Sequence, residues 1–247
     1  MSSIVHARVL IVGAGGLGVP AAIRLAQSGL EHITLVDPEL IELSNLARQV
    51  IYRTSDVGLP KAEVAARRIS EAFPGLELKA MVDALSAHNA AEFIAQHDFI
   101  IDGTDNPPIK FLINDSCVAA RRPFVYGGVL GFSGQAMTVL PGRTACLRCL
   151  FEAPPSEGEI ATCRDAGILG PVAGIIGTVQ AKEAILFARG EQPALSGRIL
   201  TYDARAGRTR TTSVRPRRGC GCGAYNNWIS LNAGREAGTS GLTQGKI

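Results

Sequence analysis

The loop Gly-Ala-Gly-Gly-Leu-Gly at positions 13–18 constrains the fold of this chain more than any other segment. It lies directly between an apolar, β-branched run at residues 7–12 and a helical pattern at residues 19–28. Its first, third and sixth residues satisfy the G-x-G-x-x-G spacing of nucleotide-binding loops. Glycines at these positions let backbone N–H groups and a helix N-terminus approach a phosphate closely. The sequence therefore predicts a nucleotide-binding strand–loop–helix unit.

Buried strands alternate with helices through the first half of the chain. The next strand, at residues 32–36, ends at Asp37, which lies 19 positions beyond Gly18 and can accept hydrogen bonds from a ribose. This alternation predicts an α/β fold with a Rossmann-like, doubly wound, mostly parallel sheet, and mixed or antiparallel strands in the C-terminal half. Further strands are expected at 76–82, 99–101, 124–129, 134–140, 199–202 and 208–214, and helices at 61–72, 86–95 with Ser86 as N-cap, 108–120 and 171–188.

One domain at residues 1–228 accounts for the chain better than two independent units, since we find no internal repeat. We expect a nucleotide-binding half at residues 7–122 and a second half at 123–228 that faces the substrate and carries the paired cysteines. Residues 229–247 are rich in small and polar residues and are expected to form a flexible tail.

The composition is that of an ordinary globular protein, with 46% hydrophobic and 19% charged residues. A net charge of +3 is too small to indicate a nucleic-acid or membrane partner. We find no apolar run of the roughly 18 residues that a membrane span needs, and no signal-peptide pattern at the start. The expected compartment is the cytoplasm, where cysteines are more often metal ligands or reactive thiols than disulfides.

A polar run at residues 44–49, together with Lys61, indicates which nucleotide is bound. The guanidinium of Arg48 and the ammonium of Lys61 suit the dense charge of a triphosphate, and a hydride-transfer site needs neither. At the end of a later strand, a carboxylate of the segment 102–106 could hold the magnesium that bridges phosphate oxygens. The alternatives are solvated surface cations and a tight turn in which Asp102 serves as a cap.

Two cysteine pairs have the spacing of a metal site. Cys146 and Cys149 form a C-x-x-C pair, and Cys220 and Cys222 form a C-x-C pair roughly 70 residues later. Four thiolates would make a closed tetrahedral zinc site that ties the C-terminal end of the chain to its middle. Two reduced pairs without a metal are the alternative.

The two remaining cysteines have different surroundings in the sequence. Cys117 lies in an amphipathic helical pattern and is expected to be a small apolar core residue. Cys163 lies in a polar loop beside Arg164, and a nearby cation lowers the pKa of a thiol and raises its thiolate fraction. Cys163 is therefore a candidate reactive thiol.

Together these features resemble the ThiF/MoeB/HesA family, the bacterial relatives of ubiquitin-activating enzymes. The resemblance covers nearly all of residues 7–222 and is closer to the thiamin-pathway, ThiF-like branch around Cys163. In that branch the matching cysteine can form a covalent link with the carrier protein. The motifs that carry the resemblance are the glycine loop, Asp37, Ser44-Asn45-Leu46-x-Arg48-Gln49, Gly58-x-x-Lys61, Asp102-x-x-Asp105-Asn106, Leu112-Ile113-Asn114-Asp115, Gly134-Gln135, the cysteine pairs, Cys163-Arg164-x-Ala166-Gly167 and the helix at 177–184.

By that resemblance, the chain would be an ATP-dependent adenylyltransferase that uses ATP and Mg²⁺ and holds a structural Zn²⁺. It would activate the C-terminal glycine carboxylate of a ubiquitin-like sulfur carrier protein ending in Gly-Gly, as an acyl-adenylate for sulfur transfer. A homodimer and a separate sulfur donor protein are also implied. The implied residues are Gly13, Gly15, Gly16, Gly18, Asp37, Asn45, Arg48, Gln49, Lys61, Asp105 and Asn106 for the nucleotide, Asp105, Arg48, Lys61 and Cys163 for catalysis, and Cys146, Cys149, Cys220 and Cys222 for zinc.

Three features depart from the family pattern. The second cysteine pair is C-x-C rather than C-x-x-C, and Lys110 stands where an arginine is common. The first strand is expected as early as residue 7, whereas family members usually carry a preceding segment with an arginine. A non-catalytic, carrier-docking subunit of the same fold and ATP-dependent activation of a carboxylate on a modified tRNA remain alternatives. A nicotinamide dehydrogenase explains neither the cations nor the cysteine pairs.

Overall fold

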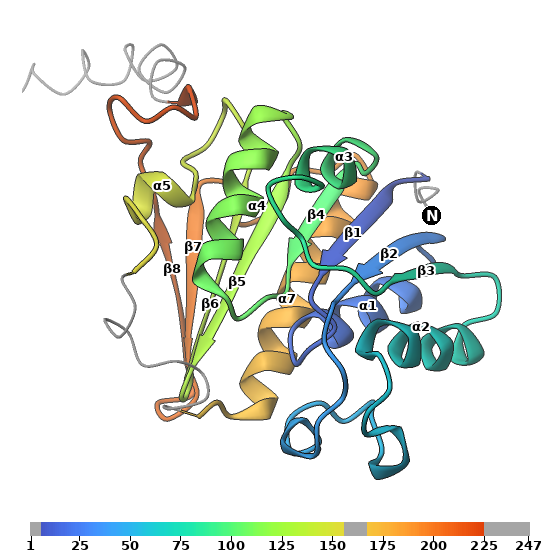
Figure 1. Cartoon of the computed structure of the whole chain (residues 1–247). Coiled ribbons are helices and arrows are strands. Elements are labelled where there is room, and N and C mark those ends of the chain that lie inside the picture. Colours follow the sequence, from blue (N-terminus) through green and yellow to red (C-terminus); the bar gives the residue numbers. More distant parts are fainter. Residues whose placement is uncertain (1–5, 156–166, 225–247) are drawn as a thin grey trace, which may run out of the picture.

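The computed structural model describes residues 6–155 and 167–224, and one eight-stranded sheet forms the centre of this part of the chain (Figure 1). The strand order is β3-β2-β1-β4-β5-β6-β7-β8. The first five strands are parallel, and β6, β7 and β8 each run antiparallel to the strand before them. The strands are β1 (Arg8–Val12), β2 (His32–Val36), β3 (Glu77–Met81), β4 (Phe99–Asp102), β5 (Phe124–Leu130), β6 (Ser133–Val139), β7 (Arg198–Asp203) and β8 (Arg208–Ser213).

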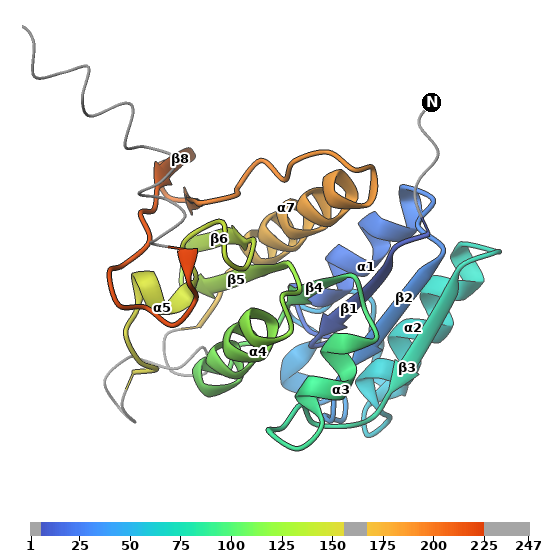
Figure 2. The ribbon, with the colours of Figure 1, turned by 90° about the horizontal axis from the view of Figure 1, so that it is seen from above.

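Helices cover both faces of the sheet, which confirms the doubly wound α/β fold expected from the sequence (Figure 2). Successive residues of β1 point to opposite faces: Val9 and Ile11 pack with α1, α2 and α7, whereas Leu10 and Val12 pack with α3, α4 and α5. Because both faces are covered, the strand is apolar from Val9 to Val12. The helices are α1 (Gly18–Gln27), α2 (Lys61–Ala72), α3 (Ala90–Ala95), α4 (Pro107–Ala119), α5 (Leu147–Leu150) and α7 (Gly170–Ala188).

The strand order reverses between β1 and β4. From β1 the sheet continues through β2 and β3 on one side, and through β4 and β5 on the other. In open α/β sheets, ligands bind outside the carboxyl ends of the strands at such a switch point. The glycine loop follows β1, and the segment 102–106 follows β4, so both lie at this edge.

Three details differ from the sequence predictions. The N-cap of α3 is Asn89 rather than Ser86, because the Asn89 side chain accepts from Ser86 N at 2.8 Å and donates to Ala84 O at 2.9 Å, closing a turn before the helix. Two short 3₁₀ helices, Leu43–Asn45 and Thr54–Asp56, interrupt the segment between β2 and α2. The one-turn helix α5 was not expected either, because four residues are too few for a hydrophobic period to be visible.

One helix bears on whether a segment is long and apolar enough to cross a membrane, although Gln180, Lys182 and Glu183 keep it from being a continuous apolar run. Within the described residues, α7 meets that test by length and composition. However, 56% of its apolar window is buried, and its residues pack against α1, β4, β5 and β6. Its apolar character is therefore accounted for as that of a core helix. The predicted tail at 229–247 lies outside the described residues.

A buried histidine joins the end of α3 to the middle of β2. His97 Nδ1 lies 2.6 Å from Phe93 O, so this nitrogen donates, and His97 Nε2 accepts from the Thr34 hydroxyl at 2.8 Å. This neutral tautomer has both ring nitrogens paired. Burial lowers the pKa of His97 below its ordinary value of 6.5.

We predict that His97 makes the protein less stable in acid. The unfolded chain takes up the proton at its ordinary pKa, whereas the folded chain resists it, so the free energy of unfolding should fall as the pH drops below about 6.5. The measurement is urea unfolding between pH 8 and pH 5. His97→Gln should flatten this part of the curve, and exposed His88→Gln should leave it unchanged; equal slopes for the His97→Gln and wild-type proteins would contradict the assignment.

Candidate functional site

Two loops at the switch point touch through glycines. A Cβ atom at Gly13 would lie 2.7 Å from Gly103 O, and Gly13 has a φ of +101°, which favours glycine. A Cβ atom at Gly18 would lie 1.8 Å from Gly13 O. The glycine loop is therefore pressed against the loop after β4, and the first turn of α1 is pressed against the glycine loop. Larger residues at these positions would separate the two loops.

Asp37 is fixed by backbone amides at the end of β2. Its carboxylate accepts from Ala14 N at 2.6 Å and from Glu39 N at 2.8 Å. Burial raises the pKa of the Asp37 carboxyl, and the two amides and the nearby Lys61 ammonium oppose that rise. A carboxylate has about four lone-pair sites, so two remain for a ligand hydroxyl. Asp37 is thus oriented beside the glycine loop, where the sequence placed a ribose-binding carboxylate.

Lys61 is the first residue of α2, and its ammonium is buried. Only 3% of the residue is exposed, and Nζ pairs with the carboxylate of Glu39, which is itself exposed. The backbone N of Lys61 also donates to Glu39 O at 3.0 Å. Glu39 was not among the residues expected from the sequence, although an acidic residue two positions after Asp37 is visible there. A phosphate approaching Lys61 would compete with this exposed carboxylate.

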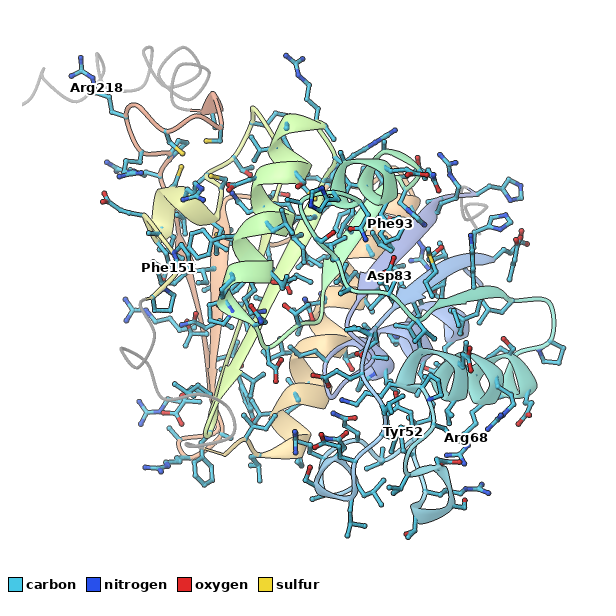
Figure 3. All side chains as sticks on the ribbon, viewed as in Figure 1. Tyr52, Arg68, Asp83, Phe93, Phe151 and Arg218 are labelled. Carbon is cyan, nitrogen blue, oxygen red and sulfur yellow. The ribbon has the colours of Figure 1, made fainter. Side chains whose placement is uncertain are left out.

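The segment between β2 and α2 is attached to the glycine loop by buried polar contacts. The Tyr52 hydroxyl lies 2.6 Å from Ala14 O, and burial raises the pKa of this phenol, so it stays protonated as a donor. Arg68 of α2 pairs with Asp56 at 2.7 Å and donates to Ile51 O. The labelled residues Tyr52 and Arg68 lie near each other, below α2 in the view of Figure 3. These contacts limit the freedom of the segment that carries the predicted phosphate-binding residues.

Arg48 and Gln49 lie against the glycine loop from this segment. A Cβ atom at Gly16 would lie 3.6 Å from Arg48 O, and one at Gly15 would lie 3.4 Å from Gln49 Nε2. Arg48 donates to Ser44 O at 2.9 Å through one guanidinium nitrogen. Gln49 is 6% exposed, and its Oε1 has no hydrogen-bond partner among the described residues. Such an orphaned carbonyl beside a glycine loop fits a site that a polar ligand completes.

Asn45 has a structural role in addition to its predicted one. The residue is buried, and its Oδ1 accepts from Glu42 N at 3.1 Å, which closes the first 3₁₀ helix. Its own backbone N donates to Glu42 O at 2.9 Å. Asn45 therefore stabilises the turn that precedes Arg48.

The two carboxylates after β4 differ in availability. Asp102 is fully buried and accepts from Thr104 N, the Thr104 hydroxyl and Lys110 Nζ, at 3.1, 2.8 and 3.0 Å. Asp105 is exposed and makes no hydrogen bond or ion pair with the described residues. Asp102 is therefore a structural anchor, whereas the Asp105 carboxylate is free to bind a cation.

Asn106 is the N-cap of α4, whereas the alternative interpretation of this segment expected Asp102 to serve as the cap. Its side chain accepts from Ile109 N at 3.1 Å, and Pro107 occupies the first helical position, where no donor is needed. The helix starts immediately after Asp105, so the N-terminus of α4 adds favourable partial charge for an anion near that carboxylate. Of the segment 102–106, Asp102 and Asn106 build the turn and Asp105 is presented by it.

The four paired cysteines converge on one point. Sγ of Cys146 lies 3.9 Å from that of Cys149 and 3.6 Å from that of Cys220, and Sγ of Cys149 lies 3.6 Å from that of Cys222. All four sulfurs lie within 4.8 Å of one another. Tetrahedral zinc with bonds of about 2.3 Å separates its sulfurs by roughly 3.8 Å. The donor set and spacing fit a metal, and the C-x-C pair completes the cluster.

The motif at residues 112–115 has a clear role in holding this cluster. Asn114 of α4 accepts from Leu147 N at 2.8 Å, which caps α5. Asp115 accepts two bonds of 2.7 Å from Arg148, between the first two cysteines. Although burial opposes it, the bonds from Arg148 and Asn114 hold the pKa of the Asp115 carboxyl below its usual range. The cysteine cluster is thereby attached to the same helix that starts beside Asp105.

The other two cysteines are separate from this cluster. Cys117 is fully buried, as predicted, and burial raises the pKa of its thiol well above the ordinary value. Cys163 and the motif that follows it lie outside the described residues up to Ala166. A catalytic role for Cys163 therefore stays a prediction.

Comparisons with known proteins agree with these motifs. A profile of the ThiF family matches residues 1–224. The chain is 38% identical over 215 residues to the sulfur carrier protein adenylyltransferase of Thermus thermophilus, covering 85% of this chain and 79% of that protein. It is 38% identical over 216 residues to the adenylyltransferase and sulfurtransferase MOCS3 of Arabidopsis thaliana, covering 87% of this chain and 47% of that protein. The chain spans about half the length of the MOCS3 relatives that it matches.

A solved structure shares the fold at low sequence identity. The crystal structure of E. coli MccB with ATP has a TM-score of 0.77 and 21% identity, covering 89% of this chain and 68% of that one. This likeness concerns the fold alone. Since the family profile spans residues 1–224 and the Thermus thermophilus relative is matched over most of its length, the chain belongs to the ThiF family.

Proposed function

We propose that this chain is an ATP-dependent adenylyltransferase that activates the C-terminal glycine carboxylate of a ubiquitin-like sulfur carrier protein. The observation that carries the proposal is the free Asp105 carboxylate, presented on a loop whose Gly103 packs against the glycine loop. A hydride-transfer site has no use for this carboxylate or for the buried ammonium of Lys61. The names of the relatives, which are adenylyltransferases, support the same reaction.

Each site residue has a role that its surroundings support. The carrier carboxylate forms a bond to the α-phosphorus of ATP, and pyrophosphate leaves; protein groups do little covalent work in such a transfer. A magnesium ion at Asp105 would neutralise charge on phosphate oxygens. Asp37 would orient the ribose, and Arg48 and Lys61 would stabilise the developing charge. The glycines of the loop (Gly13, Gly15, Gly16 and Gly18) leave room for phosphates, with Asn45, Gln49 and Asn106 shaping the site around them.

The proposal includes the partners that the sequence led us to expect. A separate sulfur donor is supported by the thiols in the described residues: Cys117 is buried, and the other four lie in the cysteine cluster. A homodimer is supported by exposed apolar side chains near the phosphate-binding residues, among them Leu43 at 66% and Val50 at 90% exposure. We place the protein in the cytoplasm, where thiolate ligands stay reduced.

We predict that Asp105→Ala abolishes adenylation without unfolding the protein. Loss of the cation-binding carboxylate should lower carrier-dependent ATP–pyrophosphate exchange by about 100-fold or more, because charge at the phosphates is no longer neutralised. The side chain is exposed and unpaired within the described residues, so the melting temperature should stay near that of the wild type. Glu92→Ala, an exposed carboxylate of α3, is the matched control and should keep full activity.

The same assay separates the competing functions. Exchange that requires a Gly-Gly carrier supports the proposal, and exchange stimulated only by a tRNA supports the second acceptor class. ATP binding and carrier binding without exchange would indicate a docking subunit. Wild-type turnover by Asp105→Ala would overturn the mechanism.

We further propose that the cysteine cluster holds one structural zinc ion. Cys222→Ser should reduce the bound zinc from about one ion per chain to near zero and lower the melting temperature, because the site ties the segment after β8 to α5. Zinc content is measured by elemental analysis after dialysis. Cys117→Ala, which removes a thiol outside the cluster, should keep the zinc. Unchanged zinc in Cys222→Ser would show that the C-x-C pair does not bind it.

A further inference from the structure

Lys110 is a buried ammonium that lies within hydrogen-bond distance of three separate groups. Its Nζ lies 3.0 Å from Asp102 Oδ2, 2.7 Å from Thr104 O and 2.5 Å from Gly127 O. An ammonium has three donors, so the described partners account for all of them. Only 9% of Lys110 and none of Asp102 is exposed. The Tyr126 ring lies 5.2 Å away and adds a cation–π contact.

These three acceptors come from different parts of the site. Asp102 ends β4, Thr104 is the residue immediately before Asp105, and Gly127 lies in the middle of β5. Lys110 itself lies on the first turn of α4, which follows Asp105 in the chain. Lys110 follows Asp105 in the chain, and its ammonium contacts Asp102 and Thr104, which precede Asp105. The contact with Gly127 also attaches this loop to β5.

Asp102 reinforces the same loop from the other side. It accepts from the Thr104 amide and the Thr104 hydroxyl, and its own backbone carbonyl accepts from Gln180 Nε2 of α7 at 2.7 Å. The pair is therefore embedded between strands and two helices. Pairing buried charges adds little net stability, whereas a buried charge without its partner is costly. A contribution to the free energy of unfolding is therefore a weak explanation for the Lys110–Asp102 pair.

We propose that Lys110 is a positioning residue for Asp105. By clamping the carbonyl that precedes Asp105, it holds the backbone that carries this carboxylate, on a loop whose Gly103 packs against the glycine loop. The Asp105 carboxylate makes no hydrogen bond or ion pair with the described residues, so its direction depends on this backbone. Lys110 does not touch the reacting groups; it acts through Thr104 and Asp102. This inference rests on the proposed adenylation for its effect on rate, but its effect on the loop does not.

The test removes the ammonium without leaving a lone buried charge. In the double variant Asp102→Asn, Lys110→Met, the amide still accepts from Thr104, and methionine fills the space of the lysine stem. Amide hydrogen exchange of residues 103–106 should become faster by about tenfold or more as the clamp is lost. In carrier-dependent ATP–pyrophosphate exchange, kcat should fall about tenfold or more, with the KM for ATP within about twofold and a higher half-saturating Mg²⁺ concentration.

Two further variants separate positioning from general stability. Lys110→Arg keeps a charged donor, so it should restore protection of the loop and most of kcat. Glu183→Gln alters a buried carboxylate that accepts from the Thr138 hydroxyl and Leu195 N, away from the loop. It should lower the melting temperature and leave loop exchange and the Mg²⁺ requirement unchanged.

The outcomes distinguish this inference from the proposed function. If the wild type shows no carrier-dependent exchange, the proposed function fails, and the hydrogen-exchange rates alone decide the role of Lys110. If residues 103–106 of the double variant keep wild-type protection, the clamp is refuted whatever the activity. If the loop loosens but kcat and the Mg²⁺ requirement match those of an active wild type, Lys110 does not position Asp105 for the reaction.

Discussion

The close approach of the loops after β1 and β4 is the contact on which the site depends. Gly13 and Gly103 meet with no room for a side chain between them, and Gly18 lies against Gly13 in turn. Because these contacts join backbone to backbone, they bring the glycine loop and the loop of Asp105 to the same edge of the sheet. Asp37, Arg48 and Gln49 reach the glycine loop from the next segment of the chain.

Helix α4 connects the loop of Asp105 with the cysteine cluster. Its N-terminal turn carries Asn106 and Lys110, which build the loop of Asp105, and its later turns carry Asn114 and Asp115, which hold α5 and the cysteine cluster. The residues that build the loop of Asp105 and those that hold the cysteine cluster therefore belong to the same helix. The loop of Asp105 and the cysteine cluster are therefore joined through one helix. The cysteine cluster is attached to the later turns of the helix whose start lies beside the Asp105 carboxylate.

Each buried lysine of the site has its charge neutralised by a carboxylate. Lys61 is buried against Glu39, and Lys110 is buried against Asp102, yet the two pairs differ in exposure. Glu39 is open to solvent, so an incoming phosphate can replace it, whereas Asp102 is enclosed and keeps its partner. The first lysine is thus available to a ligand and the second is fixed in the framework. Residue type alone does not separate these roles, because burial of the partner decides them.

The sequence by itself determined the parallel α/β fold, the glycine loop with Asp37, and the four cysteines as one group. These follow from local patterns: apolar strands, glycines at a strand–helix junction, and paired thiols. Only the tertiary structure decided that Asp102 is an anchor and Asp105 is free, that Asn89 rather than Ser86 precedes α3, and that the C-x-C pair closes the cluster. The cluster brings together Cys146 and Cys220, 74 positions apart, and Asp102 is enclosed by packed strands and helices, whereas the turn at Asn89 depends on which nearby polar side chain accepts the hydrogen bond. Hydrogen-bond partners and burial are set by packing, and no local pattern contains them.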